Sequence, residues 1–418
     1  MEVSYSEQML SAIQNEALSE AQLALTQALA NDHEDELAFL GDQLLAIGFL
    51  AEAKQVFSEL LARFPEHEEL YLSLAEVAID DDQIDEAFEY LEKIDSDSPL
   101  YPETLLITAD LYQVLGIPEV SEAKLNEAAK LLPNEPLIQF ALAELYFTTD
   151  RFGEAATLYQ MLLKAEIKEF SEISLQERLG TALSMEGQFE SAIEYLEAAL
   201  AENITENRLF QTAFVYLQLK ENQQAIHYLQ ELRALNPQYV SLYLYLAEAL
   251  QEEELLQEAQ EVIEDGIHEN PYQIDFYHFA SENAYRMGDI LAAEQFLQKS
   301  LESAGKSDET LEILSNLYLK AARYEDVILA IEQMENPEQP QIYWNLAKAN
   351  NELEEFEKAA DYYEQAAQEL HHEPEFMKEY GIFLRDEGRT SEALLLLTHY
   401  LQHEPGDLEV QSIIEALH

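Results

Sequence analysis

The chain has 418 residues, of which 48% are hydrophobic, and its 84 acidic residues outnumber 22 lysines and arginines to give a formal net charge of −62. This charge repels phosphate backbones and anionic lipid headgroups, so it disfavours nucleic acid and membrane surfaces as partners and favours basic proteins. The absence of cysteine excludes disulfides and thiolate metal sites.

The first 33 residues predict a degenerate helical pair, whose second helix carries the small and apolar residues Ala21, Leu25 and Ala28 on one face. The N-terminal residues are acidic and lack the basic and apolar segments of a signal peptide. No stretch approaches the ~18 consecutive apolar residues of a membrane helix. We therefore expect a cytoplasmic protein without membrane insertion.

Beyond residue 33 the dominant pattern is a 34-residue spacing, seen in Pro65, Pro99 and Pro133, each of which ends an apolar helical stretch. Two columns of small residues keep this spacing. The first column begins Gly41, Ala75, Ala109, Ala143 and Gly180, and the second begins Ala53, Ala87, Ser121, Ala155 and Ala192. Small residues at two fixed places in every unit predict two helices that cross closely.

A 34-residue helix–turn–helix unit with these columns resembles the tetratricopeptide repeat, and composition and units together resemble cytosolic tetratricopeptide proteins of low-GC Gram-positive bacteria. The resemblance covers essentially the whole chain. It implies an all-α, right-handed superhelical solenoid of about eleven to twelve repeats. We expect one continuous array over residues 1–418, with the degenerate repeat in 1–33, eleven repeats in 34–405 and a C-terminal capping helix in 406–418. One insertion, at residues 164–169, precedes the fifth repeat.

Catalytic constellations are not apparent in the sequence. The segment from Ala304 to Ser307 resembles the end of a phosphate-binding loop, but the upstream glycine and a preceding strand are missing, which favours a turn between helices. The adjacent His371 and His372 favour an exposed helix end over a metal site, because neighbouring helical residues point about 100° apart. We expect no enzyme activity, no metal and no cofactor.

In this family the first helix of each repeat lines a concave groove. At one groove position the first four repeats carry carboxylates, which are Asp42, Glu76, Asp110 and Glu144. Apolar residues at neighbouring groove positions are Leu45, Leu72, Ile79, Leu106, Phe140, Phe147, Phe210 and Phe214. This N-terminal groove predicts a partner segment with basic and large apolar side chains. The alternative is that packing buries the apolar residues and the acids only solvate the surface.

The C-terminal groove has a different composition. Its candidate residues are Asn316, Lys320, Trp344, Asn345, Lys348, Asn351, Lys378 and Arg385. A charged end of a partner is expected to dock here, with Trp344 as an aromatic anchor. The alternative is that these bases pair with neighbouring acids.

The sequence thus predicts a scaffold or adaptor that binds another protein or peptide in an acidic concave groove. A peptide-sensing regulator, whose superhelix responds to a short peptide, is the alternative function.

Overall fold

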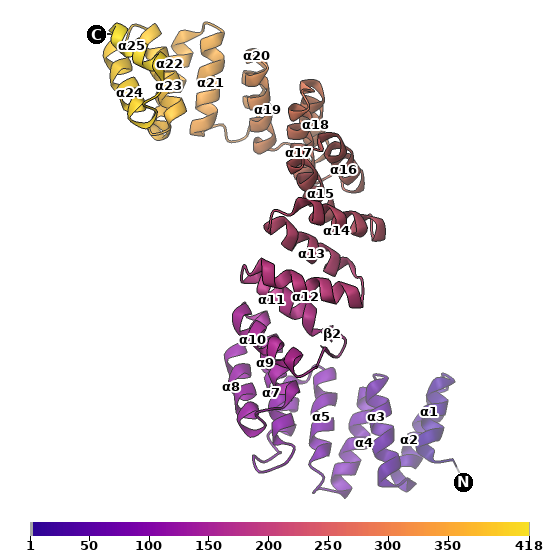
Figure 1. The fold of residues 1–418 in the computed structure, drawn as a ribbon. Helices are drawn as coiled ribbons and strands as arrows, with labels where there is room; N and C mark the ends of the chain where they lie inside the picture. The colour runs from indigo at the N-terminus through magenta and orange to yellow at the C-terminus, as the bar shows by residue number, and fades with distance from the viewer. Residues whose placement is uncertain (1–2, 418) are drawn as a thin grey trace. The chain divides into compact units, whose positions relative to one another are not determined.

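The computed structural model describes residues 3–417, which form helices apart from connecting turns and one short hairpin (Figure 1). The predicted all-α tetratricopeptide-repeat fold class is confirmed. The helices fall into two compact units, of which one ends at Asn203 and the other begins at Ile204. The single continuous array over residues 1–418 stays a prediction.

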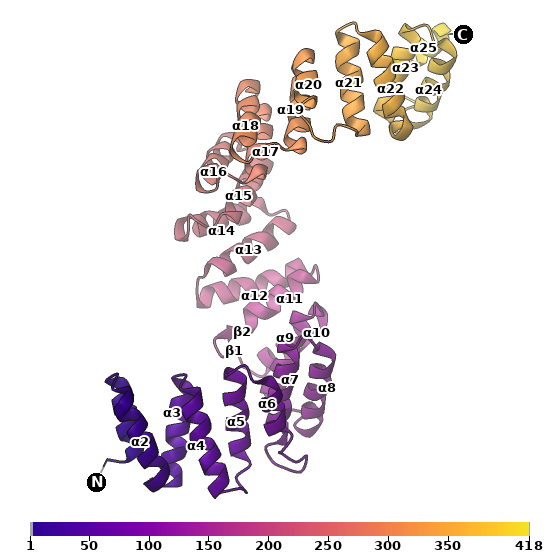
Figure 2. The ribbon, with the colours of Figure 1, turned by 180° about the vertical axis from the view of Figure 1, so that it is seen from behind.

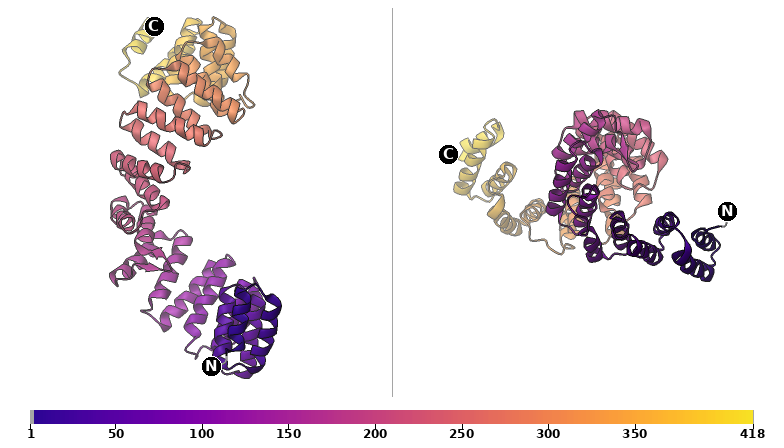
Figure 3. Two further views of the ribbon diagram at one scale, coloured as in Figure 1. Left: turned by 90° about the vertical axis from the view of Figure 1, so that its right-hand side faces the viewer. Right: turned by 90° about the horizontal axis from the view of Figure 1, so that it is seen from below.

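The first unit contains α1 to α12, in which each odd-numbered helix packs against the even-numbered helix that follows it. Their bounds are α1 Tyr5–Gln14, α2 Leu18–Asn31, α3 Glu34–Ala46, α4 Leu50–Arg63, α5 Glu69–Asp80, α6 Ile84–Leu91, α7 Tyr101–Val114, α8 Pro118–Leu131, α9 Pro136–Thr148, α10 Phe152–Lys164, α11 Leu175–Met185 and α12 Phe189–Glu202. The indigo N-terminal helices lie side by side in the left-hand view of Figure 3. The pair α1 and α2 occupies the stretch in which a degenerate repeat is expected.

The second unit contains α13 to α25, again as pairs, and Figure 2 shows them from behind. Their bounds are α13 Glu206–Gln218, α14 Asn222–Leu235, α15 Ser241–Glu252, α16 Leu256–Glu269, α17 Ile274–Arg286, α18 Ile290–Ser303, α19 Asp308–Lys320, α20 Tyr324–Ile331, α21 Pro340–Glu352, α22 Phe356–Leu370, α23 Pro374–Asp386, α24 Thr390–His403 and α25 Leu408–Leu417. Helix α25 packs on α24, where Val410 is fully buried.

The two columns of small residues mark the places where paired helices cross. A Cβ atom on Gly180 would lie 2.7 Å from the Leu196 side chain and 3.2 Å from the Ala192 carbonyl oxygen, so the first column abuts the second. Gly381 has the same environment, with Leu397 2.6 Å from such an atom. Close packing of this kind leaves no room for a larger side chain.

Each first helix of a pair is followed, two residues after its last residue, by a residue with left-handed backbone geometry. From α3 onward these residues are Gly48, Asp82, Gly116, Asp150, Gly187, Lys220, Glu254, Gly288, Ala322, Glu354 and Gly388. At the first of them the Phe49 amide donates to the Leu44 carbonyl at 2.8 Å, which closes the helix end. The turn between paired helices is therefore one repeated structure, whether or not glycine occupies it.

Between α10 and α11 lies an antiparallel hairpin of β1 (Glu169–Phe170) and β2 (Ile173–Ser174), whose first residue is the last one of the predicted insertion at residues 164–169. Its two-residue turn has positive φ at Ser171 and Glu172, as a tight hairpin turn requires. The sequence predicted extra residues before the fifth repeat but no strand. Ser174 then begins α11, because its side chain accepts a hydrogen bond from the Glu177 amide.

Candidate partner-binding surfaces

Three of the four predicted carboxylates are exposed and unpaired on successive first helices. Asp42 lies on α3, Glu76 on α5 and Asp110 on α7, and all three are exposed. Within residues 3–417 none of them has a lysine, arginine or histidine within ion-pair distance. We call these three residues the acidic face of the first unit.

Two carboxylates of the acidic face, those of Asp42 and Glu76, are close enough for their charges to repel. Partial burial raises the pKa of Asp42. Burial also raises the pKa of Glu76, and so do the charges of Glu103, Asp42 and Asp80. Like charges held together without a counter-ion cost stability, so this arrangement is not explained by folding alone.

Replacing Glu76 by glutamine is expected to stabilise the first unit by a few tenths of a kcal/mol at neutral pH, because it removes a repelled charge. Because the pKa of Glu76 is higher in the folded than in the unfolded state, its negative charge destabilises the folded state at pH values above the folded-state pKa. The gain should therefore shrink as pH falls through the folded-state pKa towards 4.5, the ordinary value. Urea unfolding across this pH range measures it, with Glu89→Gln on α6 as the control, and a gain independent of pH would contradict the assignment.

Apolar side chains accompany the acidic face. Leu45, Ile79 and Leu106 are half-buried on the same helices, so part of each side chain is available to a partner. Leu72 is only 7% exposed and packs within the helix layer instead. Both predicted outcomes therefore occur side by side: packing buries one of these residues and leaves three of them partly accessible.

Glu144, the fourth predicted carboxylate, is paired. Arg178 of α11 lies 2.9 Å from it, and the Tyr159 hydroxyl donates a hydrogen bond to it. The same guanidinium lies over the ring of Phe147 at 4.8 Å. Sequence analysis missed Arg178, because it lies beyond the insertion on the next first helix, more than thirty positions from its partner. Glu144 therefore belongs to a structural cluster, unlike the acidic face.

The remaining aromatic residues of the predicted N-terminal groove also have partners. Phe140 stacks on Phe170 of the hairpin, with ring centroids 4.6 Å apart. Phe210 and Phe214 belong to the second unit, where both pack against Tyr245. These rings are half-buried by their neighbours.

Several C-terminal candidates are engaged within the protein. Lys378 pairs with Asp407 at 2.8 Å and with Glu409 at 3.0 Å. Arg385 pairs with Asp386. Lys378 and Arg385 therefore pair with neighbouring acids, which is the alternative that the sequence left open for these bases.

Trp344 and Asn345 are buried beneath the C-terminal surface, where each forms a hydrogen bond to a neighbouring side chain. The Trp344 indole is 8% exposed and donates to Glu379 at 2.7 Å. Asn345 is completely buried, and its amide donates to the Asn316 side chain at 2.8 Å. A partner on this surface would therefore meet Asn316, which Asn345 holds in place.

Lys320 and Lys348 differ from the other C-terminal bases. Within the described residues neither has a carboxylate within ion-pair distance, although the chain is strongly acidic. Lys348 lies over the Trp344 ring at 4.2 Å, and Lys320 lies over the Tyr285 ring at 4.9 Å. Burial lowers the pKa of Lys348. Each ammonium group thus lies on an aromatic face, and the more distant charges of Glu379 and Glu375 act on Lys348 in the direction opposite to burial.

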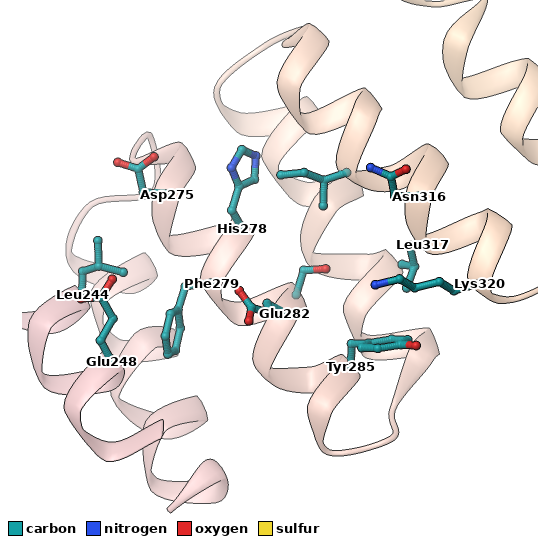
Figure 4. A pocket seen from close by; sticks show the side chains of 12 residues that line it. Leu244, Glu248, Asp275, His278, Phe279, Glu282, Tyr285, Asn316, Leu317 and Lys320 are labelled. Atoms are coloured by element: carbon teal, nitrogen blue, oxygen red, sulfur yellow. The ribbon is translucent and has the colours of Figure 1, made fainter. Parts of the chain in front are cut away.

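A cavity of about 450 Å³ lies on α15, α17 and α19 of the second unit, and Lys320 and Asn316 line one part of it (Figure 4). A second cavity on α19, α21 and α23 is lined by Lys320, Lys348 and Asn351. Four of the predicted C-terminal residues thus line cavities. Sequence analysis missed Glu248, Glu282 and Tyr285 of the first cavity, although the first two occupy the same repeat position as Asn316.

Residues 3–417 contain no group of three or more histidine, cysteine, aspartate or glutamate residues that is arranged to hold a metal ion. None of their helices combines the length and apolar character needed to cross a membrane.

Comparison with protein families matches three family models. "YpiA-like, C-terminal tetratricopeptide repeats" matches residues 340–407, and "YpiA-like, tetratricopeptide repeats" matches residues 113–167. The general tetratricopeptide repeat matches residues 44–113 and 216–277. One relative, the TPR repeat-containing protein YpiA of Bacillus subtilis (strain 168), is 33% identical over 392 residues, which is 93% of this chain and 92% of that protein.

Solved structures of low sequence identity also resemble the chain. The APC/C hetero-tetramer Cut9-Hcn1 matches with a TM-score of 0.41 and 12% identity over 99% of this chain and 96% of that one. A tetratricopeptide repeat protein from Parabacteroides merdae ATCC 43184 matches with a TM-score of 0.43 and 18% identity, over 59% of this chain and 98% of that one. YrrB, described as a TPR protein with an unusual peptide-binding site, matches with a TM-score of 0.39 and 16% identity, over 48% and 97%.

Proposed function

This chain belongs to the YpiA family of tetratricopeptide-repeat proteins, and we propose that it is a scaffold whose acidic face holds a basic, apolar segment of another protein. Tetratricopeptide-repeat proteins bind other proteins or peptides. The proposal assigns this general role to a particular surface, α3, α5 and α7 of the first unit, and to a particular partner chemistry.

The observation that carries the proposal is the lack of counter-ions at Asp42, Glu76 and Asp110. Several bases elsewhere in the chain pair with acids from neighbouring repeats, as Lys54 does with Glu86 at 2.5 Å. Among residues 3–417 the acidic face has no such base, and the charge of Asp42 repels that of Glu76. A lysine or arginine from a partner would relieve this repulsion.

The half-exposed leucines and isoleucine of these helices define the rest of the partner. Leu45, Ile79 and Leu106 offer apolar contact beside each carboxylate, and removing that surface from water yields about 25 cal/mol per Å². The partner segment therefore alternates basic with large apolar side chains. Charge steers its approach, and apolar contact retains it.

Titration with a labelled peptide that alternates lysine with leucine tests the proposal. We expect saturable binding at low salt that weakens at high salt, because the screening length falls to about 3 Å at 1 M. A peptide that alternates glutamate with leucine is the matched control and should not bind. Equal binding of the two peptides, or binding that salt leaves unchanged, would refute a charge-selective surface.

A further inference from the structure

The cavity on α15, α17 and α19 has opposite charges at its two ends. Glu248 of α15 lies at one end and Lys320 of α19 at the other, with α17 between them (Figure 4). The two residues do not form an ion pair with each other. A ligand in the cavity would therefore meet a carboxylate at one end and an ammonium group at the other.

Glu248 has no counter-ion within the described part of the chain. Burial raises the pKa of its carboxyl group, as do the charges of Glu252 and Glu282. Its neighbour Glu282 is already paired with Arg286 at 2.8 Å. Asp275 also lines the cavity, and its carboxylate accepts a hydrogen bond from the Gln273 side-chain amide at 3.0 Å. A partly buried carboxylate without a partner is costly, and a cation from outside would reduce that cost.

Lys320 provides an unpaired positive charge at the other end of the cavity. Its ammonium group lies 4.9 Å from the centre of the Tyr285 ring and has no carboxylate within ion-pair distance among residues 3–417. Asn316 stands one helical turn earlier on α19, and Asn345 orients it through the hydrogen bond already described. This end of the cavity therefore presents a positive charge and an oriented amide, which suit a carboxylate.

Apolar side chains from all three first helices contribute to the cavity lining. Leu244 lies beside Glu248, Phe279 comes from α17 and Ile313 from α19, and the polar His278, Ser281 and Glu282 of α17 line the cavity with them (Figure 4). Phe279 is 8% exposed and therefore forms the floor rather than the rim. The apolar stretch offers a place for one large side chain of a ligand.

We propose that this cavity binds an internal, dipolar segment of a partner protein, with a basic side chain at Glu248, an apolar side chain on Phe279 and an acidic side chain at Lys320. The cavity crosses three first helices, so a chain passing over it meets these groups in order. Charge complementarity at both ends determines the direction in which the segment lies. The site lies in the second unit and does not depend on the acidic face of the first unit.

The test uses capped synthetic peptides in which leucines of varied number separate lysine from glutamate, in both orders. Capping removes the terminal charges, so binding reports an internal segment, and peptides with free ends distinguish recognition of a terminus. We expect one order of lysine and glutamate to bind about tenfold more tightly than the other. In the disfavoured order the peptide glutamate would lie at Glu248 and the peptide lysine at Lys320, which places like charges together at both ends of the cavity. Equal affinity for both orders, or tighter binding that requires free ends, would overturn the proposal.

Charge-exchange variants make the test specific to this cavity. Glu248→Lys and Lys320→Glu should each weaken the preferred peptide about tenfold, and the double variant should reverse the preferred order. The control is Glu258→Lys with Lys299→Glu, which exchanges the same charges on the second helices α16 and α18. Circular dichroism verifies that each variant is folded. Loss of binding in the control pair, or an unchanged preference in the double variant, would place the peptide elsewhere.

Discussion

Replacing Ala53 by leucine is expected to destabilise the first unit by about 1–3 kcal/mol, because the new side chain overpacks the crossing of α3 and α4. Ala53 is completely buried, and the facing small residue Gly41 is already so close that an added Cβ would lie 2.5 Å from Phe57. The core therefore has to shift to admit the larger residue. Thermal and urea unfolding followed by circular dichroism measure the loss.

Ala51→Leu is the matched control, since Ala51 lies on the same helix but is exposed. Its effect should stay within about 0.5 kcal/mol of wild type. The stability of each repeat depends on its neighbours, so a long array need not unfold in a single two-state step. The two variants should therefore be compared by the midpoint of the first unfolding transition that changes. Equal transitions for the two variants would contradict the close crossing.

Reversing the acidic face, with Asp42, Glu76 and Asp110 all changed to lysine, is expected to weaken binding of the lysine–leucine peptide about tenfold or more. Each reversal replaces an attraction by a repulsion at the point of contact, and tenfold corresponds to only 1.4 kcal/mol. Helicity should stay the same, because the three side chains are exposed. Fluorescence anisotropy at low salt provides the affinity.

The control for this reversal changes Glu52, Glu89 and Glu119 to lysine, which alters the net charge equally but on the second helices α4, α6 and α8. If the general field of the chain attracted the peptide, both triple variants would lose affinity alike. A large loss in the acidic-face variant with a small loss in the control supports the proposed surface. The dipolar peptide of the second unit should bind equally well to the two triple variants.

The repeat period was sufficient to predict the fold, because the same small residues recur where helices cross. Gly180 and Ala192 illustrate why: a contact that repeats every unit must be satisfied by the same residue types at the same spacing. The turns were less predictable. Ala322 takes a left-handed conformation that costs an ordinary residue about 1–2 kcal/mol, and the packing of its two helices overrides that local preference.

For the candidate sites, too, the repeat pattern predicted some properties and only the tertiary structure showed others. The position of a side chain within its repeat identified Asp42, Glu76, Lys320 and Lys348 as surface residues, since the repeat places one face of each first helix outward. Whether each charge has a partner depends on residues from other repeats, as the pairing of Glu144 with Arg178 shows.

The sequence by itself therefore determined the helical repeat, its register and the sign of charge along each first helix, because these follow from local spacing. Only the tertiary structure decided which charges remain unpaired and which of them line one cavity. Ion pairing and burial depend on distances between helices that are far apart in the chain, and periodicity carries no information about those distances.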